Sequence, residues 1–324
     1  MRTQKSTNGE SVPACYNAPI FPMTRKNKKP IKIVCVVGPT SSGKTDFGIR
    51  LARAFNGEIV SADSRQVYRG FDLCSGKVTK KEMKAIPHYL LNIASPRKTF
   101  SVSQYVALAN KAVRTIAQKN KIPFIVGGTG FYIDALTEGL IIPEVKPNRA
   151  LRDKLEQKTT KELFRLLKQK DPQRAKTIDS YNPRRLVRAL EIVDALGKVP
   201  KQKKLSPYET LYIGLRPKEN ILKKRIHNRL IVRLKRGMIR EIKNLHEKER
   251  LSWKRLKSFG LELKYASLYL QGKLTHQEMK EQLEYAIFQY AKRQMTWFKR
   301  NQDIHWVMTY TQAKKLVKEF IQIQ

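Results

Sequence analysis

The sequence predicts an α/β protein in which a parallel sheet is flanked by helices, with a mainly helical insertion and a helical C-terminal part. Short apolar segments of strand character alternate with stretches of helical periodicity over residues 31–139. Residues 140–207 lack strand signals, and a further apolar segment after them precedes a long helical stretch. Because parallel strands need a long crossover between them, this alternation favours strands joined by helices rather than by hairpins.

The expected strands are short runs rich in β-branched residues. They cover Ile31–Val37, Glu58–Ser61, Ile122–Val126, Leu211–Leu215 and Ile304–Met308. Helices are expected where apolar residues recur at spacings of three and four. These stretches are residues 46–55, 100–119, 151–168, 183–196, most of 217–300, and the C-terminal end.

The expected elements divide the chain into four parts. Residues 1–30 are rich in Pro, Asn, Ser and Thr and end in a basic cluster, so we expect a disordered basic tail. Residues 31–139 form the α/β core, and residues 140–207 form a helical insertion. Residues 208–324 return to the core sheet and supply the C-terminal helices.

The charge balance narrows the class of partner. Lys and Arg number 66 against 27 Asp and Glu, which gives a formal net charge of +39. Such a charge favours a polyanionic partner, with nucleic acid first and an anionic membrane surface or phosphorylated substrates as alternatives. No apolar run approaches the roughly 18 residues of a membrane span. Because Cys15, Cys35 and Cys74 form no CxxC pair, we expect a cytoplasmic protein without a disulfide scaffold or zinc site.

A phosphate-binding loop follows the first expected strand. Residues 38–45 read Gly-Pro-Thr-Ser-Ser-Gly-Lys-Thr and fit the pattern G-x-x-x-x-G-K-[ST]. The glycines let backbone N–H groups converge on phosphate oxygens, and the following helix presents its positive end. Lys44 can neutralise the outer phosphate, and Thr45 can hold Mg²⁺ through its hydroxyl. With a strand before it and a helix after it, the motif predicts a P-loop NTPase-like core.

The acids of this core are not arranged as in most NTPases. Such enzymes hold Mg²⁺ with an acid at the end of another strand, whereas the third expected strand runs into Gly127-Gly128-Thr129-Gly130. Asp63 instead follows the second strand, at the edge where α/β sheets place their ligands. A lone Asp there is also a common cap or turn residue. Its neighbours Arg65 and Gln66 can bond a base and a backbone phosphate, which favours a binding role.

These motifs, together with later ones, resemble the tRNA dimethylallyltransferases, also called isopentenyl-tRNA transferases. The matching segments fall in that family's order over residues 31–308. They are residues 38–45, 63–68, 87–91, 127–130 with Tyr132, 182–185 with 188–191, and 291–294 with 296–297. The chain departs from the family after Gly260, where Leu261 and Glu262 replace an aromatic residue and a cation, and more modestly over residues 73–77.

The resemblance implies transfer of a dimethylallyl group from dimethylallyl diphosphate to N6 of the adenosine on the 3′ side of the anticodon in tRNA. The loop would hold the diphosphate leaving group rather than ATP. Asp63 would bond the N6 amine and act as the base, Thr129 would lie near the reacting centre, and Arg152 would lie near the diphosphate and tRNA. Lys44 would complete the catalytic set.

The resemblance also implies two sets of binding residues. The diphosphate would be held by Gly38, Pro39, Thr40, Ser41, Ser42, Gly43, Lys44 and Thr45, with Mg²⁺ on Thr45. The tRNA anticodon stem-loop would be contacted by Asp63, Ser64, Arg65, Gln66, Arg184, Arg185, Arg188 and Lys257. We expect the protein to act as a monomer and without a membrane partner.

Two other functions stay open from the residues alone. One is a P-loop kinase or NTPase acting on nucleotides, which the strand end at residues 127–129 argues against. The other is a non-enzymatic RNA-binding or ribosome-associated protein, which the intact Lys44, Thr45 and Asp63 argue against.

A set of arginines also repeats along an expected helix, which is continuous unless Gly237 breaks it. Its members are Arg225, Arg229, Arg233, Arg236 and Arg240. At the helical period they share an arc of about 80°. This pattern predicts either a stripe that follows RNA phosphates or an ordinary solvated basic face.

Overall fold

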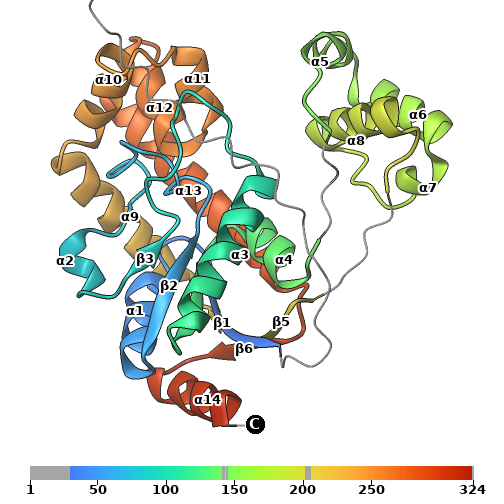
Figure 1. Cartoon of the computed structure of the whole chain (residues 1–324). Helices are drawn as coiled ribbons and strands as arrows, with labels where there is room; N and C mark the ends of the chain where they lie inside the picture. The colour runs from blue at the N-terminus through green and yellow to red at the C-terminus, as the bar shows by residue number, and fades with distance from the viewer. Residues whose placement is uncertain (1–29, 141–142, 144, 201–205, 323–324) are drawn as a thin grey trace, which may run out of the picture. The chain divides into compact units, whose positions relative to one another are not determined.

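Six parallel strands form the sheet of the core (Figure 1). The computed structural model describes residues 30–140, 143, 145–200 and 206–322. In these residues the strands are β1 (Ile31–Val37), β2 (Gly57–Ala62), β3 (His88–Tyr89), β4 (Ile122–Gly127), β5 (Tyr208–Leu215) and β6 (Ile304–Val307). Their order is β3-β2-β4-β1-β5-β6, and each neighbouring pair is parallel. The predicted parallel sheet is therefore confirmed.

All five expected strands are present, with ends that differ from the expected ones by three residues or fewer. β3 was not predicted from the sequence, because a strand of two residues is too short to carry an alternating pattern. β1 pairs with β4 on one side and with β5 on the other. The chain therefore returns from the insertion to a strand inside the sheet, between β1 and β6, rather than to its edge.

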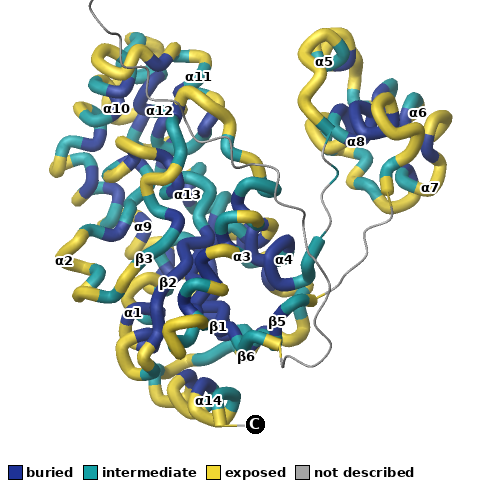
Figure 2. Tube along the Cα trace, viewed as in Figure 1, coloured by how far each residue is buried: buried dark blue, intermediate teal, exposed yellow. Residues whose placement is uncertain are grey.

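Alternate residues of β1 pack on opposite faces of the sheet, as the pleat of a strand requires. Ile33, Cys35 and Val37 pack with residues of α3 (Val102–Gln118) and α4 (Gly130–Thr137). Val34 and Val36 pack with residues of α1 (Lys44–Ala54) and α14 (Tyr310–Gln322). Figure 2 shows β1 and β2 as buried between these layers. Helices on both faces leave the carboxyl ends of the strands as the accessible edge.

The C-terminal helices have a core of their own. It combines α9 (Glu219–Lys235), α10 (Met238–Glu247), α11 (Trp253–Ser258), α12 (Leu261–Leu270) and α13 (His276–Phe298). Val67, Tyr68, Phe71 and Cys74, which follow β2, belong to the same core. The segment after β2 is thus fixed by helices that are distant in sequence. The short helix α2 (Lys80–Met83) comes next along the chain.

The helix expected over residues 225–240 is interrupted at Gly237, the position at which the sequence left a break open. α9 ends at Lys235, and α10 begins after Gly237, whose φ of 94° is left-handed. Because side chains other than glycine disfavour this region, the glycine separates the two helices.

The insertion is helical, as predicted. It contains α5 (Arg149–Glu156), α6 (Thr160–Lys170), α7 (Pro172–Ala175) and α8 (Pro183–Leu196), which bury a cluster of their own. The single helix expected over residues 151–168 is wrong, since Thr159 starts a new helix. Its side chain caps the amide of Glu162, and the Glu162 side chain caps Thr159 in return.

Some expectations fall outside the described residues. The predicted tail lies outside them except for Pro30, and so do residues 201–205 of the connection into β5. The four-part division of the chain stays a prediction. No described helix is both long and apolar enough to cross a membrane.

A buried carboxylate joins the strands at the edge opposite the phosphate loop. Glu58 is 1% exposed and accepts hydrogen bonds from Lys121 Nζ at 2.8 Å, Lys119 Nζ at 3.1 Å and Tyr89 Oη at 2.7 Å. Burial alone raises the pKa of Glu58, but hydrogen bonds from Lys121, Tyr89 and Lys119 lower it more, so its pKa lies below 4.5. The charged form therefore stabilises the fold.

We expect Glu58→Gln to lower the free energy of unfolding at neutral pH by about 1–2 kcal/mol, since both lysines are partly exposed. Because the folded pKa is depressed, this stabilisation is present above pH 4.5 and is lost as the pH falls through the folded pKa. Urea denaturation of the wild type and the variant at pH 7 and at about pH 3 tests this. A difference of equal size at both pH values would contradict it.

Candidate active site

The phosphate loop runs from the end of β1 into α1, as the motif predicts. Gly43, with a left-handed φ of 93°, comes directly before the first residue of α1. Lys44 lies inside the loop and donates to the Pro39 carbonyl at 3.0 Å. Burial lowers the pKa of Lys44 to about 8, an effect that nearby Asp63 opposes and Arg229 reinforces. A half-buried cation of lowered pKa marks a place where an anion would be stabilised.

A cavity of about 260 Å³ opens beside the loop. Its walls come from the loop, the end of β2, α9, the α11–α12 turn and α13. They include Thr40, Lys44, Thr45, Asp63, Ser64, Arg65, Gln66, Arg229, Phe259, Gly260, Leu261, Glu262, Leu263, Ile287, Tyr290 and Gln294. The structure therefore brings Lys44, Thr45 and Asp63 to one cavity. A larger hollow of about 850 Å³ beside α4, β5 and β6 contains none of the predicted site residues.

Asp63 has a turn role in addition to its place in the cavity. Its Oδ1 accepts hydrogen bonds from the backbone N–H groups of Arg65 at 2.8 Å and Gln66 at 3.3 Å. Thr129 lies at the next strand end, where its Oγ1 accepts from the Ser64 N–H at 3.0 Å. The turns after β2 and β4 are thus joined. The roles of Asp63 and Thr129 in catalysis stay predictions.

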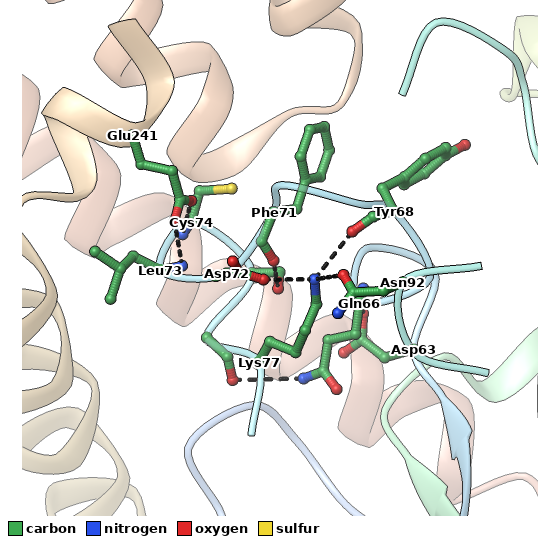
Figure 3. A network of polar contacts seen from close by, with 12 residues as sticks. Asp63, Gln66, Tyr68, Phe71, Asp72, Leu73, Cys74, Lys77, Asn92 and Glu241 are labelled. Atoms are coloured by element: carbon green, nitrogen blue, oxygen red, sulfur yellow. Dashed lines mark hydrogen bonds and ion pairs between the residues drawn. The ribbon is translucent and has the colours of Figure 1, made fainter. Parts of the chain in front are cut away.

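The segment that follows Asp63 is held in place by a polar network (Figure 3). Lys77 Nζ donates to the Tyr68 carbonyl at 3.0 Å and to Asp72 Oδ1 at 2.8 Å. Glu241 of α10 accepts from the backbone N–H groups of Leu73 at 2.8 Å and Cys74 at 2.9 Å. These bonds fix the backbone of residues 68–77, which follows the turn that the Asp63 carboxylate itself holds.

Neither sequence interpretation holds for the arginines at the centre of α9. Arg229 Nη2 donates to the Gly76 carbonyl at 2.8 Å and lines the cavity, and burial lowers its pKa. Arg233 is buried and donates to the carbonyls of Leu73 and Cys74. These side chains point inward because carbonyl acceptors lie there. Arg229 is not among the site residues predicted from the sequence, since spacing alone does not reveal which way a helix face turns.

Glu262, where the chain departs from the family pattern, has a defined partner. It forms an ion pair with Arg233 at 2.8 Å, and the two side chains are 14% and 8% exposed. A buried guanidinium needs an anionic acceptor, which Glu262 supplies. Glu262, which lines the cavity, therefore balances the charge of the buried Arg233.

Two glycines in the turn after β4 leave room for side chains of α13, a helix that is distant in sequence. Gln294 of α13 accepts from the Thr40 N–H at 2.8 Å and donates to the Gly128 carbonyl at 2.7 Å. A Cβ at Gly128 would lie 2.4 Å from Gln294 Nε2, and one at Gly130 would lie 2.2 Å from Trp297 Cδ1. Only glycine permits this contact between α13 and the turn after β4.

The predicted insertion residues are engaged within the insertion. Arg152 donates to Glu191 through Nε and Nη2, each at 2.7 Å, and Arg188 donates to the Val145 carbonyl at 2.9 Å. Arg184 and Arg185 are exposed on α8. Lys257 lies on α11 and is half-buried. The predicted contacts of these residues with tRNA or diphosphate stay predictions.

The fold and the cavity define a phosphate-loop protein that has an acidic residue beside an anion site. A family model described as IPP transferase matches residues 66–301, and the chain belongs to this family. The family has a P-loop NTPase-like fold, in agreement with the sheet described above. Comparisons with individual proteins agree with this assignment.

The chain is similar to proteins named tRNA dimethylallyltransferase. It is 37% identical to that of Halothermothrix orenii, in an alignment that covers 93% of this chain and 99% of the relative. It is 38% identical to that of Anoxybacillus flavithermus over 280 residues, which cover 85% and 89%.

Solved structures are similar as well. The full-length tRNA isopentenylpyrophosphate transferase of Bacillus halodurans matches with a TM-score of 0.68 and 32% identity, covering 90% of this chain and 96% of that one. A eukaryotic dimethylallyltransferase acting on tRNA matches with a TM-score of 0.78 and 26% identity, covering 90% and 79%.

We expect Gly130→Ala to displace Trp297 and, through α13, Gln294. Overpacking of this kind costs about 1–3 kcal/mol, and misplaced site groups cost up to about 10²-fold in turnover. Gly272→Ala is the control, since a Cβ there meets nothing within 4 Å and only its φ of +70° is strained, at about 1–2 kcal/mol. Thermal melting and substrate turnover are measured for both. Equal losses of turnover would count against the contact.

Proposed function

We propose that this protein transfers a dimethylallyl group from dimethylallyl diphosphate to N6 of the adenosine on the 3′ side of the anticodon in tRNA. The observation that carries the proposal is the cavity shared by the phosphate loop and Asp63. A loop for a diphosphate and a carboxylate for an amine are the two requirements of this reaction. The names of the relatives and the net charge of +39 support tRNA as the acceptor.

The chemistry assigns a task to each side of the cavity. The N6–C1 bond forms as the bond between C1 and the diphosphate oxygen breaks, and the N6 proton passes to Asp63. An adenine amine is a weak nucleophile, so the leaving diphosphate must be strongly stabilised. Preorganised donors such as the loop amides, Lys44 and Arg229 contribute about 3–4 kcal/mol each. A positioned base contributes roughly 10²–10⁴-fold.

Apolar side chains complete the cavity. Leu261, Leu263, Ile287 and Val126 line it together with the polar groups. They offer a surface for a five-carbon group and keep water from a reactive allylic cation. The adenine has to leave its stack in the anticodon loop to reach Asp63, as for other enzymes that act on bases.

The residues present fit Mg²⁺ as an accessory ion. The Thr45 hydroxyl and the Asp63 carboxylate both line the cavity, and Mg²⁺ prefers oxygen ligands that include substrate phosphates and water. In the described part of the chain, no group of three or more His, Cys, Asp or Glu side chains could hold a metal ion. Thr45 would therefore hold the ion together with the substrate. When bound, it would add positive charge at the leaving diphosphate.

Incubation with unmodified tRNA and labelled dimethylallyl diphosphate tests the proposal. We expect label in the tRNA, on N6 of the adenosine next to the anticodon, and loss of transfer when EDTA removes Mg²⁺. ATP consumption without transfer would indicate a kinase or NTPase instead. Binding of tRNA without transfer, by a protein that also binds diphosphate, would indicate a non-enzymatic RNA-binding protein.

We expect Asp63→Ala to lower turnover by more than about a hundredfold while tRNA affinity stays near that of the wild type, because the base acts on a proton rather than on the bulk of the RNA. Asp46→Ala is the matched control, since Asp46 lies on α1 with its side chain 66% exposed and only a long ion pair to Lys84. Single-turnover kinetics and a filter-binding assay measure the two effects. Near wild-type turnover in Asp63→Ala would remove Asp63 from the mechanism.

A further inference from the structure

Gln294 lies where α13 meets the phosphate loop, and its side chain has no role in the reaction described above. It is 7% exposed, and its carboxamide connects the Thr40 N–H to the Gly128 carbonyl. We propose that Gln294 sets the number of phosphates that the loop accepts at two, because it takes the amide donor that a third phosphate would need. The inference rests on the proposed function, since it concerns the same anion site.

The orientation of the carboxamide follows from its partners. A carbonyl only accepts hydrogen bonds, so the group that faces the Gly128 oxygen at 2.7 Å must be the Nε2 amine. Oε1 then faces the Thr40 N–H at 2.8 Å. A flipped amide would place Oε1 against the Gly128 oxygen and Nε2 against the N–H, so that both hydrogen bonds would be lost. The acceptor is therefore fixed toward the loop.

Lys44 serves as a landmark for the position of Gln294 along the loop. In a loop of this type the lysine reaches the outer phosphates. A Cβ at Gly128 would lie 2.4 Å from Gln294 Nε2 and 3.4 Å from Lys44 Nζ, so the two side chains meet at one point. Thr40 and Gln294 both line the cavity that contains Asp63. Because Lys44 marks where the outer phosphates would lie, Gln294 would border the outer end of the anion site, in the wall of the cavity that Asp63 also lines.

A third phosphate at this end would face an acceptor in place of a donor. An N–H has one hydrogen, and that of Thr40 is already used. A phosphate oxygen is also an acceptor, so one brought against Oε1 would be buried without a hydrogen-bond donor. An unpaired buried acceptor of this kind costs about 1–3 kcal/mol. An uncharged allylic group in the same place needs no hydrogen-bond donor. Net charge alone favours the more highly charged anion, so a preference for two phosphates needs a local cause of this kind.

Calorimetry of the full chain with inorganic pyrophosphate and tripolyphosphate, in the presence of Mg²⁺, tests the inference without turnover. We expect the wild type to bind pyrophosphate at least about tenfold more tightly than tripolyphosphate, from the cost of one unpaired buried acceptor. In Gln294→Ala and Gln294→Leu the Thr40 N–H becomes free. We expect both variants to bind tripolyphosphate about tenfold more tightly than the wild type does, with a smaller change for pyrophosphate.

The two replacements differ in size, so agreement between them identifies the hydrogen bond as the cause. Gln271→Ala, on the C-terminal end of α12 outside the cavity lining, is the control and should change neither affinity. Thermal melting checks that each variant folds. The inference is overturned if the wild type shows no preference, if neither variant gains affinity for tripolyphosphate, or if only the alanine variant does.

The failure of this inference is distinguishable from the failure of the proposed function. A wild type that transfers dimethylallyl groups to tRNA but binds both anions equally overturns the role of Gln294 alone. A wild type that binds neither anion overturns both, because each needs a loop that holds a diphosphate.

Discussion

The contact between α13 and the turn after β4 is the interaction on which the site depends. Gln294 bonds the phosphate loop on one side and the Gly128 carbonyl on the other, and Trp297 packs where Gly130 lacks a side chain. Trp297 Nε1 also donates to Asp134 at 2.8 Å, which anchors the end of α13 on α4. These bonds join the C-terminal helices to the sheet. Without them the cavity would lose one wall, and the loop would lose the group that completes its outer end.

The second constraint on the site is the positive charge of Lys44 and Arg229, which are partly withdrawn from water. Lys44 and Arg229 are both half-buried, and loss of contact with water lowers the pKa of each, a cost that the protein bears before any substrate binds. Arg233 is balanced by Glu262, and Arg229 has the Gly76 carbonyl as its partner. Lys44 and Arg229 therefore place positive charge in the cavity wall, where the leaving group would sit. An anion that enters this cavity is stabilised by groups that need no rearrangement.

The same arrangement explains how a phosphate loop can serve a reaction other than phosphoryl transfer. The turn after β4 carries glycines that leave room for the side chains of Gln294 and Lys44, rather than an acid that holds Mg²⁺. Asp63 lies at the end of the neighbouring strand β2, and the Ser64 N–H bonds Thr129 across the gap. The phosphate loop follows β1 and Asp63 follows β2, so both lie at the carboxyl ends of parallel strands, with β4 between them, where open α/β sheets bind their ligands.

The sequence by itself determined the five longer strands, the phosphate loop and the place of Asp63 after β2. These features are local, because the spacing of apolar residues and the motif itself determine each of them within a segment of about ten residues. It did not determine β3, the break before Thr160, the separation of α9 from α10, or the direction of Arg229 and Arg233. Nor did it reveal that Gln294 bonds Thr40, a residue 254 positions away. Only the tertiary structure decided these points, because the direction in which a polar side chain turns depends on partners that folding brings from distant segments.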